Sequence, residues 1–403
     1  MPDYRPVPES DRDEFRRLLT YAFRPTERYD PEEDDEEPKP AQPGDPRGIY
    51  DGDELLATGR HHWFTLDVRG EPHGVGGLSA VSTPPQNRRR GLVRRLLAES
   101  LAEYREREHY LSALWPFEYA FYRKFGWATT SRYAETTFDP DALSFVDGVE
   151  PPGEGTGRYR ELSGDDWKAM ETVYRAANDR GLSMHRTEEW WRKRVLTWWE
   201  AEPYAYGWER DGDLRGYLVY DVQDDDEAEG RTMRVNELCA ADHEARLELL
   251  RFCRYHDSQV KRVRLYGPVD TTLQDLVSDP RGVEVEVKPG PMSRLVDVER
   301  ALDALSYPEE ATGTVTLAVG DDLVEWNDGT FRLAVEDGRA TCERTDGAPD
   351  VRVDVGTLSQ VAVGYHAVED ARLYGDLSVE DEGAAETLAA LFPPEGTFLR
   401  EGF

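Results

Sequence analysis

The run from Gly74 to Gly91 restricts the possible folds of this chain more than any other segment. An alternating apolar stretch typical of a β-strand ends at Val81–Thr83, and after two prolines Arg88–Gly91 leads directly into a helical pattern that begins at Leu92. The first N–H groups of a helix have no partner within the helix, and the helix dipole gives them partial positive charge. The segment therefore predicts a strand, a loop and a helix start that bind a phosphate group.

The three consecutive arginines, Arg88, Arg89 and Arg90, stand out because the chain has 82 Asp and Glu against 49 Lys and Arg, a net charge of −33. Two alternatives to phosphate binding stay open. The run could be a solvated helix start, or a local nucleic-acid patch, although no aromatic or basic residues extend it as such a patch requires. The overall negative charge repels phosphate backbones and anionic lipids, so we expect neither nucleic acid nor a membrane as a partner.

The acidic composition also indicates the environment in which the protein works. Only six of the 49 basic residues are lysine, and abundant acid with scarce lysine is typical of proteins from salt-loving archaea. In molar salt the Debye length falls to roughly 3 Å, so surface charges repel each other only weakly. An ordinary acidic cytosolic protein is the alternative. No stretch approaches the roughly 18 apolar residues of a membrane span, and the first residues lack the layout of a signal peptide, so we expect a cytoplasmic protein.

Cysteine and histidine give no sign of a metal site. The three cysteines, Cys239, Cys253 and Cys342, are too few and too widely separated for a zinc ribbon or a disulfide framework. The eight histidines include no pair at the spacing of a metal-binding helix. We therefore predict that the protein holds no metal.

The order of predicted strands and helices divides the chain into three domains of mixed α and β structure. Residues 1–150 carry a meander of strands, a long helix and a pair of strands within 128–138, with an acidic, proline-rich surface loop over 25–48 that is either an insertion or a substrate lid. Residues 151–292 repeat the same order of elements. Residues 293–403 begin with a helix, continue with alternating strands and end with helices.

Two motifs resemble those of the GNAT superfamily of N-acetyltransferases. The run Arg88–Val93 resembles its R/Q-x-x-G-x-G/A acetyl-CoA motif, with Val93 at the last position, and residues 120–127 resemble its YxxFGF segment. Over essentially all 403 residues the chain resembles the Eis (enhanced intracellular survival) type of this superfamily, and residues 322–331 resemble a sterol-carrier strand pattern. The resemblance implies two tandem GNAT folds followed by a sterol-carrier-protein-like domain.

The resemblance also implies roles for individual residues. Tyr122 matches the family's general acid, and Phe403 matches a terminal aromatic residue whose α-carboxylate is the general base. Phe117 stands where the family usually has a small residue. The positions that match acetyl-CoA contacts are Val81, Ser82, Thr83, Arg89, Arg90, Gly91, Leu92, Val93, Arg94, Phe117 and Glu118.

These roles form a coherent reaction, in which a primary amine attacks the thioester of acetyl-CoA directly within a ternary complex. The amine loses a proton, and the departing thiolate gains one. A phenol of pKa about 10 donates more easily if its pKa is lowered, and Arg123 and Lys124 are candidates for lowering the pKa of Tyr122. The residues alone favour a core aromatic that packs with Phe121 and Phe125, and it is the resemblance that favours the catalytic role of Tyr122.

We therefore expect an acetyl-CoA-dependent N-acetyltransferase for a small-molecule or peptide amine, such as an aminoglycoside, a polyamine or a lysine side chain. The resemblance further implies a homo-oligomer, specifically a hexamer, and a third domain that delivers the chain's C-terminus to the first. The alternative is a non-catalytic lipid or acyl carrier, or an interaction protein, that uses its C-terminal domain.

The second domain is predicted to have lost its phosphate site. Residues 238–245 carry acid and histidine where the first domain carries arginine, so we expect this domain to form one wall of the substrate cleft. Its two tryptophan pairs, at 190–191 and 198–199, are either packing residues or a hydrophobic substrate wall.

Overall fold

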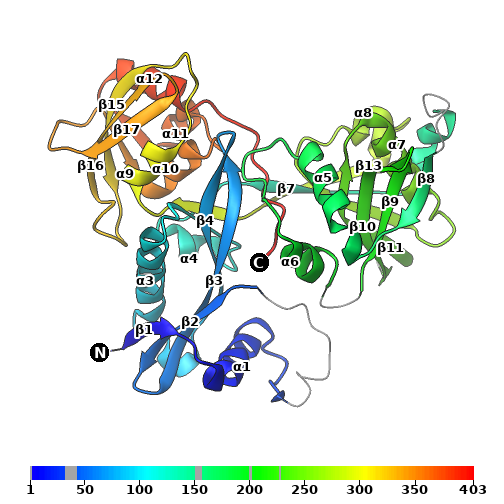
Figure 1. Cartoon of the computed structure of the whole chain (residues 1–403), viewed down its shortest axis with the longest axis horizontal. Coiled ribbons are helices and arrows are strands. Elements are labelled where there is room, and N and C mark those ends of the chain that lie inside the picture. The colour runs from blue at the N-terminus through cyan, green and yellow to red at the C-terminus, as the bar shows by residue number, and fades with distance from the viewer. Residues whose placement is uncertain (1, 32–42, 150–156, 199–201, 227) are drawn as a thin grey trace.

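The structure is a computed structural model that describes residues 2–31, 43–149, 157–198, 202–226 and 228–403. These residues form three β-sheets, two of seven strands and one of five, each accompanied by helices (Figure 1). The predicted mixed α and β architecture is confirmed. Residues 32–42, in the predicted acidic loop, lie outside the described residues.

The first sheet has the order β1-β2-β3-β4-β5-β14-β6, and its neighbours are antiparallel except for the parallel pair β4 and β5. The helix α3 buries one apolar stripe against it, because Leu97, Leu101 and Tyr104 recur at helical spacing. The strands are β1 (Asp3–Pro6), β2 (Asp45–Asp51), β3 (Glu54–Val68), β4 (Glu71–Ser82), β5 (Leu111–Leu114), β6 (Ala128–Thr129) and β14 (Met292–Leu295), and the helices are α1 (Arg12–Phe23), α3 (Leu92–Glu106) and α4 (Tyr119–Arg123).

The second sheet has the order β13-β7-β12-β11-β10-β9-β8. Alternate residues of β10 pack into different clusters, Tyr217 and Val219 with α5, and Leu218 and Tyr220 with α7, so the two helices cover opposite faces. The strands are β7 (Arg132–Phe138), β8 (Gly157–Glu161), β9 (Tyr204–Arg210), β10 (Asp213–Asp225), β11 (Gly230–Ala240), β12 (Arg262–Gly267) and β13 (Val283–Pro289), and the helices are α5 (Trp167–Ala177), α6 (Glu188–Trp190), α7 (His243–Arg254) and α8 (Leu273–Leu276).

The third sheet has the order β17-β16-β15-β18-β19. Figure 1 shows that the long strands β3 and β4 extend between this sheet and the second one. Its strands are β15 (Gly313–Gly320), β16 (Gly329–Glu336), β17 (Arg339–Arg344), β18 (Val351–Asp354) and β19 (Leu377–Val379), and its helices are α9 (Val298–Ala304), α10 (Val355–Ala362), α11 (Val368–Tyr374) and α12 (Glu382–Leu391).

The strands of the first two sheets do not follow the order of the chain, which the sequence did not indicate. The expected strand pair within residues 128–138 is wrong, because β6 pairs with β14 in the first sheet, whereas β7 pairs with β12 and β13 in the second. Only Thr130 and Ser131 separate β6 from β7, and both are buried. Alternation of side chains shows that a segment is a strand, but it does not show which distant strand completes its hydrogen bonds. The boundaries at 150 and 292 stay a proposal.

One apolar core runs through all three parts of the molecule. It includes Phe64 of β3, Tyr174 of α5, Leu302 of α9 and Phe331 of β16. Leu399, near the end of the chain, is fully buried in the same core. The last residues are therefore packed against the rest of the molecule.

Candidate active site

The parallel strands β4 and β5 separate beyond a short stretch of pairing. Residues 75–77 of β4 pair with residues 111–113 of β5, but β4 continues to Ser82 whereas β5 ends at Leu114. Ala80 adopts a positive φ of 56°, and the register with β3 shifts at this point, so β4 contains a bulge. The two strands thus form an opening in the sheet, where backbone groups of β4 beyond Gly77 do not pair with β5 and are available to an extended ligand.

The end of β4 and the residue after it carry the first of the residues that were predicted to contact acetyl-CoA. The Ser82 hydroxyl lies 2.7 Å from that of Thr58, and Val81 is buried in the core beneath α3. The Thr83 hydroxyl is buried and has no hydrogen-bond partner among the described residues. Buried polar atoms normally have a partner, so this group is available to a ligand.

The helix start lies immediately after this strand. Gly91 has a positive φ of 77°, which favours glycine, and an added Cβ would meet no atom of the chain within 4 Å. The Arg95 N–H donates to the Gly91 carbonyl at 3.0 Å, and this bond closes the first helical turn. The N–H groups of the first helical residues therefore point out of the helix, as an anion site requires.

The arginines around this helix start bind neutral oxygens. Arg88 donates to the Thr83 carbonyl at 3.1 Å, and Arg90 donates to the side-chain oxygen of Asn87 at 2.6 Å. Arg94 donates to the carbonyl of Asp322 in the third domain. Within the described part of the chain, no carboxylate forms an ion pair with these side chains, so positive charge is left for an anionic ligand.

Tyr122 lies in an aromatic cluster on α4. It is 3% exposed, and its ring centroid lies 5.5 Å from that of Phe117 and 5.2 Å from that of Phe121. Burial raises the pKa of Tyr122. The expectation that Arg123 and Lys124 lower this pKa is wrong, because burial is its cause and the Arg123 side chain is 73% exposed, 3.7 Å from Asp376.

Two predicted neighbours of the thiol lie at the start of α4. The Glu118 carboxylate accepts a hydrogen bond from the Ala120 N–H at 3.3 Å and so caps the helix. Phe117 is 62% exposed, on the outer side of the aromatic cluster that contains Tyr122.

The end of the chain lies on a different face. The Phe403 ring lies 4.6 Å from Phe64 and 5.3 Å from His62, measured between centroids. His62 is opposite Gly77, the last residue of β4 that pairs with β5, and an added Cβ on Gly77 would meet both Phe64 and His62. Phe403 therefore packs on the face of the sheet where the opening between β4 and β5 begins, whereas Tyr122 packs in the cluster beneath α3.

A buried ionic network holds this C-terminal segment. Arg186 donates to Glu401 at 2.8 Å and, through both ends of its guanidinium group, to Glu237 at 2.7 and 2.9 Å. Tyr174 donates to Glu401 at 2.9 Å, and Trp115 donates to the Glu401 carbonyl at 2.6 Å. These residues have no motif, and they are far apart in the sequence, so sequence reasoning missed them.

A cleft of about 360 Å³ opens between the first domain, the second domain and this segment. Of the predicted tryptophan pairs, Trp190 and Trp198 line the cleft, Trp191 is fully buried in the core, and Trp199 lies outside the described residues. The lining also includes Trp115, Tyr133, Glu135, Arg186, Arg194, Val195, Val219, Asn236, Glu237, Tyr266, Arg400, Glu401 and Gly402.

The corresponding helix start of the second domain is closed. The Asp242 carboxylate caps α7 by accepting the Ala245 N–H at 2.8 Å, and it also binds Arg215 at 2.5 Å. The Asp242 carboxylate already binds at the N-terminus of α7, where a phosphate group would bind, so this helix does not offer a phosphate site. Among the described residues there is no cluster of three or more histidine, cysteine, aspartate or glutamate side chains suited to a metal, and no helix long and apolar enough to cross a membrane.

Comparison with known proteins places each part of the chain. Residues 3–130 and 182–295 each match an acetyltransferase (GNAT) domain model, and residues 298–400 match a sterol carrier protein domain model. An uncharacterized N-acetyltransferase of Streptomyces avermitilis is 30% identical over 330 residues, 79% of each chain. The N-acetyltransferase Eis of Mycobacterium tuberculosis is 28% identical over 359 residues, 86% of this chain and 85% of its own.

Solved structures share the whole fold. Eis1 from Mycobacterium abscessus superposes with a TM-score of 0.77 at 24% identity, and a GCN5-related N-acetyltransferase from Anabaena variabilis with 0.84 at 18%, each over 100% of both chains. The fold is thus two GNAT domains followed by a sterol-carrier-like domain, as the sequence predicted. The chain belongs to the GNAT N-acetyltransferases, in their Eis-like form. It is an N-acetyltransferase, so the non-catalytic carrier is set aside.

Proposed function

We propose that the protein transfers the acetyl group of acetyl-CoA to a primary amine by direct attack within a ternary complex. The GNAT fold implies acetyl-CoA as the co-substrate. The observation that carries the proposal is the opening between β4 and β5, which ends at a helix start with uncompensated arginines. There the diphosphate would bind the main chain of residues 89–93 and the Arg94 side chain, and the pantetheine would follow Val81–Thr83.

Tyr122 is the proposed proton donor to the departing thiolate. The phenol is protonated at neutral pH and can therefore donate a proton, although burial raises its pKa and makes it a weaker acid than an exposed phenol. Phe117 and Glu118 would border the thiol from the start of α4. Backbone N–H groups of the opened strand would stabilise the oxyanion that forms as the amine attacks.

The α-carboxylate of Phe403 is the proposed proton acceptor from the attacking amine. The rings of His62 and Phe64 pack against the Phe403 side chain and hold the end of the chain on the face of the sheet where the opening between β4 and β5 begins. The proposed acceptor enters through the cleft lined by Trp115, Trp190 and Tyr266. These aromatic walls suit an aliphatic amine of polyamine, aminoglycoside or lysine type.

Two measurements test this function. Titration calorimetry should detect binding of acetyl-CoA to the purified protein, and a thiol reagent should detect CoA release when a panel of polyamines, aminoglycosides and lysine peptides is added. Tyr122→Phe should leave CoA binding intact and lower the rate of thiol release by about a hundredfold, the loss expected for a general acid. Failure to bind acetyl-CoA would contradict the proposal before any acceptor is known.

A further inference from the structure

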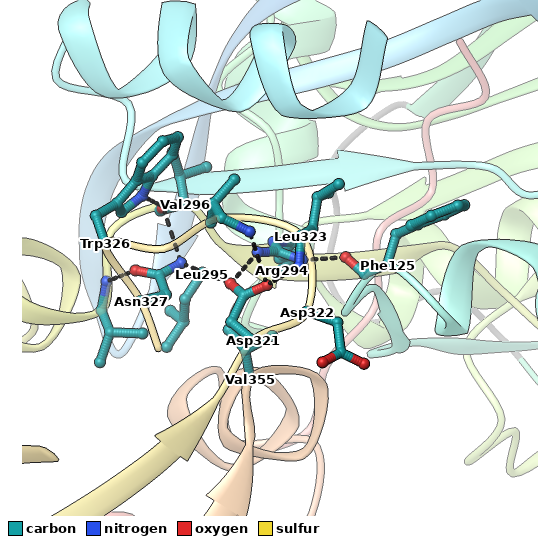
Figure 2. Close-up of polar contacts among 12 residues, drawn as sticks. Phe125, Arg294, Leu295, Val296, Asp321, Asp322, Leu323, Trp326, Asn327 and Val355 are labelled. Atoms are coloured by element: carbon teal, nitrogen blue, oxygen red, sulfur yellow. Dashed lines mark hydrogen bonds and ion pairs between the residues drawn. The ribbon is translucent and has the colours of Figure 1, made fainter. Parts of the chain in front are cut away.

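A loop of the third domain reaches into the first domain. Residues 321–328 connect β15 to β16, and Figure 2 shows Asp321 and Leu323 of this loop beside Arg294 of β14. Trp326 and Asn327 donate hydrogen bonds to the Val296 carbonyl at 2.8 and 3.1 Å, and Val324 is buried in the core beneath α3. The loop is thus packed into the domain that carries the proposed acetyl-CoA site.

An ion pair buried between a strand of the first sheet and this loop lies at the centre of this contact. Arg294 is 0% exposed, and its guanidinium group donates to the Asp321 carboxylate (Figure 2). The same carboxylate accepts the Leu323 N–H at 2.9 Å and the Asn327 side-chain amide at 3.2 Å. Both charges are removed from water, so the pair requires these additional hydrogen bonds to be tolerated in the interior.

The other end of the guanidinium group binds the segment that follows Tyr122. Arg294 donates to the Phe125 carbonyl, and the N–H groups of Phe125 and Trp127 both donate to the Tyr122 carbonyl, at 2.9 and 3.3 Å. The Arg294 guanidinium also lies 5.2 Å from the centre of the Trp127 ring. The main chain of Tyr122 is therefore connected to Asp321 through Arg294 and one peptide segment.

Gly126 explains how the arginine approaches so closely. Its φ of 82° lies in the left-handed region, and an added Cβ would lie 2.3 Å from the Arg294 guanidinium and 2.5 Å from Val355 of α10. The glycine of the Phe-Gly-Trp motif thus leaves room for a side chain of β14 and for the third domain.

The same loop contacts the helix of the proposed diphosphate site. Arg94, in the first turn of α3, donates to the carbonyl of Asp322. One loop of the third domain therefore holds α3 beside the proposed diphosphate site, and through Arg294 it holds α4, which carries Tyr122.

We propose that Arg294 and Asp321 are positioning residues, which fix Tyr122 relative to the thioester sulfur, so that the third domain completes the acetyl-transfer site. This inference rests on the proposed role of Tyr122. A displacement of about 1 Å in a reacting group can reduce a rate about a hundredfold without loss of substrate binding. The third domain then contributes to catalysis through the position of α4, in addition to carrying the end of the chain.

Kinetics of Arg294→Lys and Asp321→Asn test the proposal. Lysine keeps the charge but cannot bind Asp321 and the Phe125 carbonyl at once, and asparagine keeps the shape but removes the ion pair. We expect kcat for thiol release to fall about tenfold to a hundredfold, with KM for acetyl-CoA within about twofold of wild type. Asp321→Asn keeps the test valid if Arg294→Lys does not fold.

Arg105→Met is the matched control. Arg105 forms an ion pair of 2.6 Å with Asp297 across the same pair of domains, at the far end of α3 from Arg94. Its loss should leave kcat within about twofold of wild type. Equal rates for Arg105→Met and for both Arg294→Lys and Asp321→Asn would overturn the proposal.

A double mutant separates positioning from general damage. Once Tyr122→Phe has removed the hydroxyl, adding Arg294→Lys should lower kcat no further, because no donor is left to misplace. A further loss as large as in the wild-type background would overturn the proposal while leaving the role of Tyr122 intact. A wild-type rate for Tyr122→Phe itself would instead overturn the proposed function of Tyr122.

Discussion

Tyr122 is a residue whose surroundings predict a pH dependence. Burial raises its pKa above the ordinary value of about 10, so the donor form persists where an exposed phenol would ionise. The ratio of the wild-type rate to the Tyr122→Phe rate should therefore stay constant from about pH 7 to about pH 10. Thiol-release kinetics measured with both proteins check this. A ratio that falls towards one, with a midpoint below about pH 10, would contradict the buried phenol.

His62 predicts how stability depends on pH. Burial lowers its pKa to about 3 in the folded protein, against about 6.5 in an unfolded chain. The unfolded state therefore binds more protons between these values, and stability is lost as the pH falls through that range. Between about pH 7 and about pH 4.5, the free energy of unfolding of the His62→Gln variant should therefore decrease by about 2 kcal/mol less than that of the wild type. Urea unfolding at both pH values measures this, and an equal loss in both proteins would contradict it.

The sequence could place residues whose role depends on a local motif, but not those defined by distant partners. Arg88–Gly91 and Tyr122 belong to short recognisable runs, and the structure puts Arg88–Gly91 at a helix start and buries the Tyr122 side chain of α4. Arg294 has no such context, because its partners Phe125 and Asp321 lie 169 and 27 residues away along the chain. The prediction that Arg123 and Lys124 lower the pKa of Tyr122 was wrong for a related reason, because side chains that are neighbours in the sequence of a helix need not point the same way.

At the scale of elements, two turns provide a matched test of the start of α3. Gly91 and Gly52 both have positive φ, 77° and 61°, and neither would meet another atom through an added Cβ. Alanine should strain both turns by about 1 kcal/mol, but only Gly91→Ala alters the helix start that is proposed to hold the diphosphate. Calorimetry should show weaker acetyl-CoA binding for Gly91→Ala alone. Equal affinities of the two variants for acetyl-CoA would show that the diphosphate binds elsewhere.

The sequence predicted individual strands and helices from their local patterns, but it did not predict which strands pair with each other. The alternation of residues 132–138 correctly indicates a strand, yet β7 lies in the second sheet, and β14 returns to the first after more than a hundred residues. Side-chain alternation specifies which face of a strand is buried, whereas the partner strand is chosen by the packing of the whole chain. The chain therefore passes between the two sheets twice, from β6 to β7 and from β13 to β14.

At the scale of the whole molecule, all three domains meet the C-terminal segment. The second domain holds Glu401 through Arg186, the first holds it through Trp115, and the third leads into it from α12. The second domain therefore has a structural role at the end of the chain, because its buried Glu237 compensates the Arg186 charge that anchors this segment.

This arrangement predicts the effect of lengthening the chain. One glycine added after Phe403 would turn its α-carboxylate into an amide, which cannot accept a proton, while Arg186 and Trp115 would still hold Glu401. We expect thiol release to fall by at least about a hundredfold, the contribution of a general base, with acetyl-CoA binding unchanged by calorimetry. Phe403→Leu is the control, since it keeps the carboxylate and reduces only the ring packing. An extended protein that keeps the wild-type rate would show that the base lies elsewhere in the cleft.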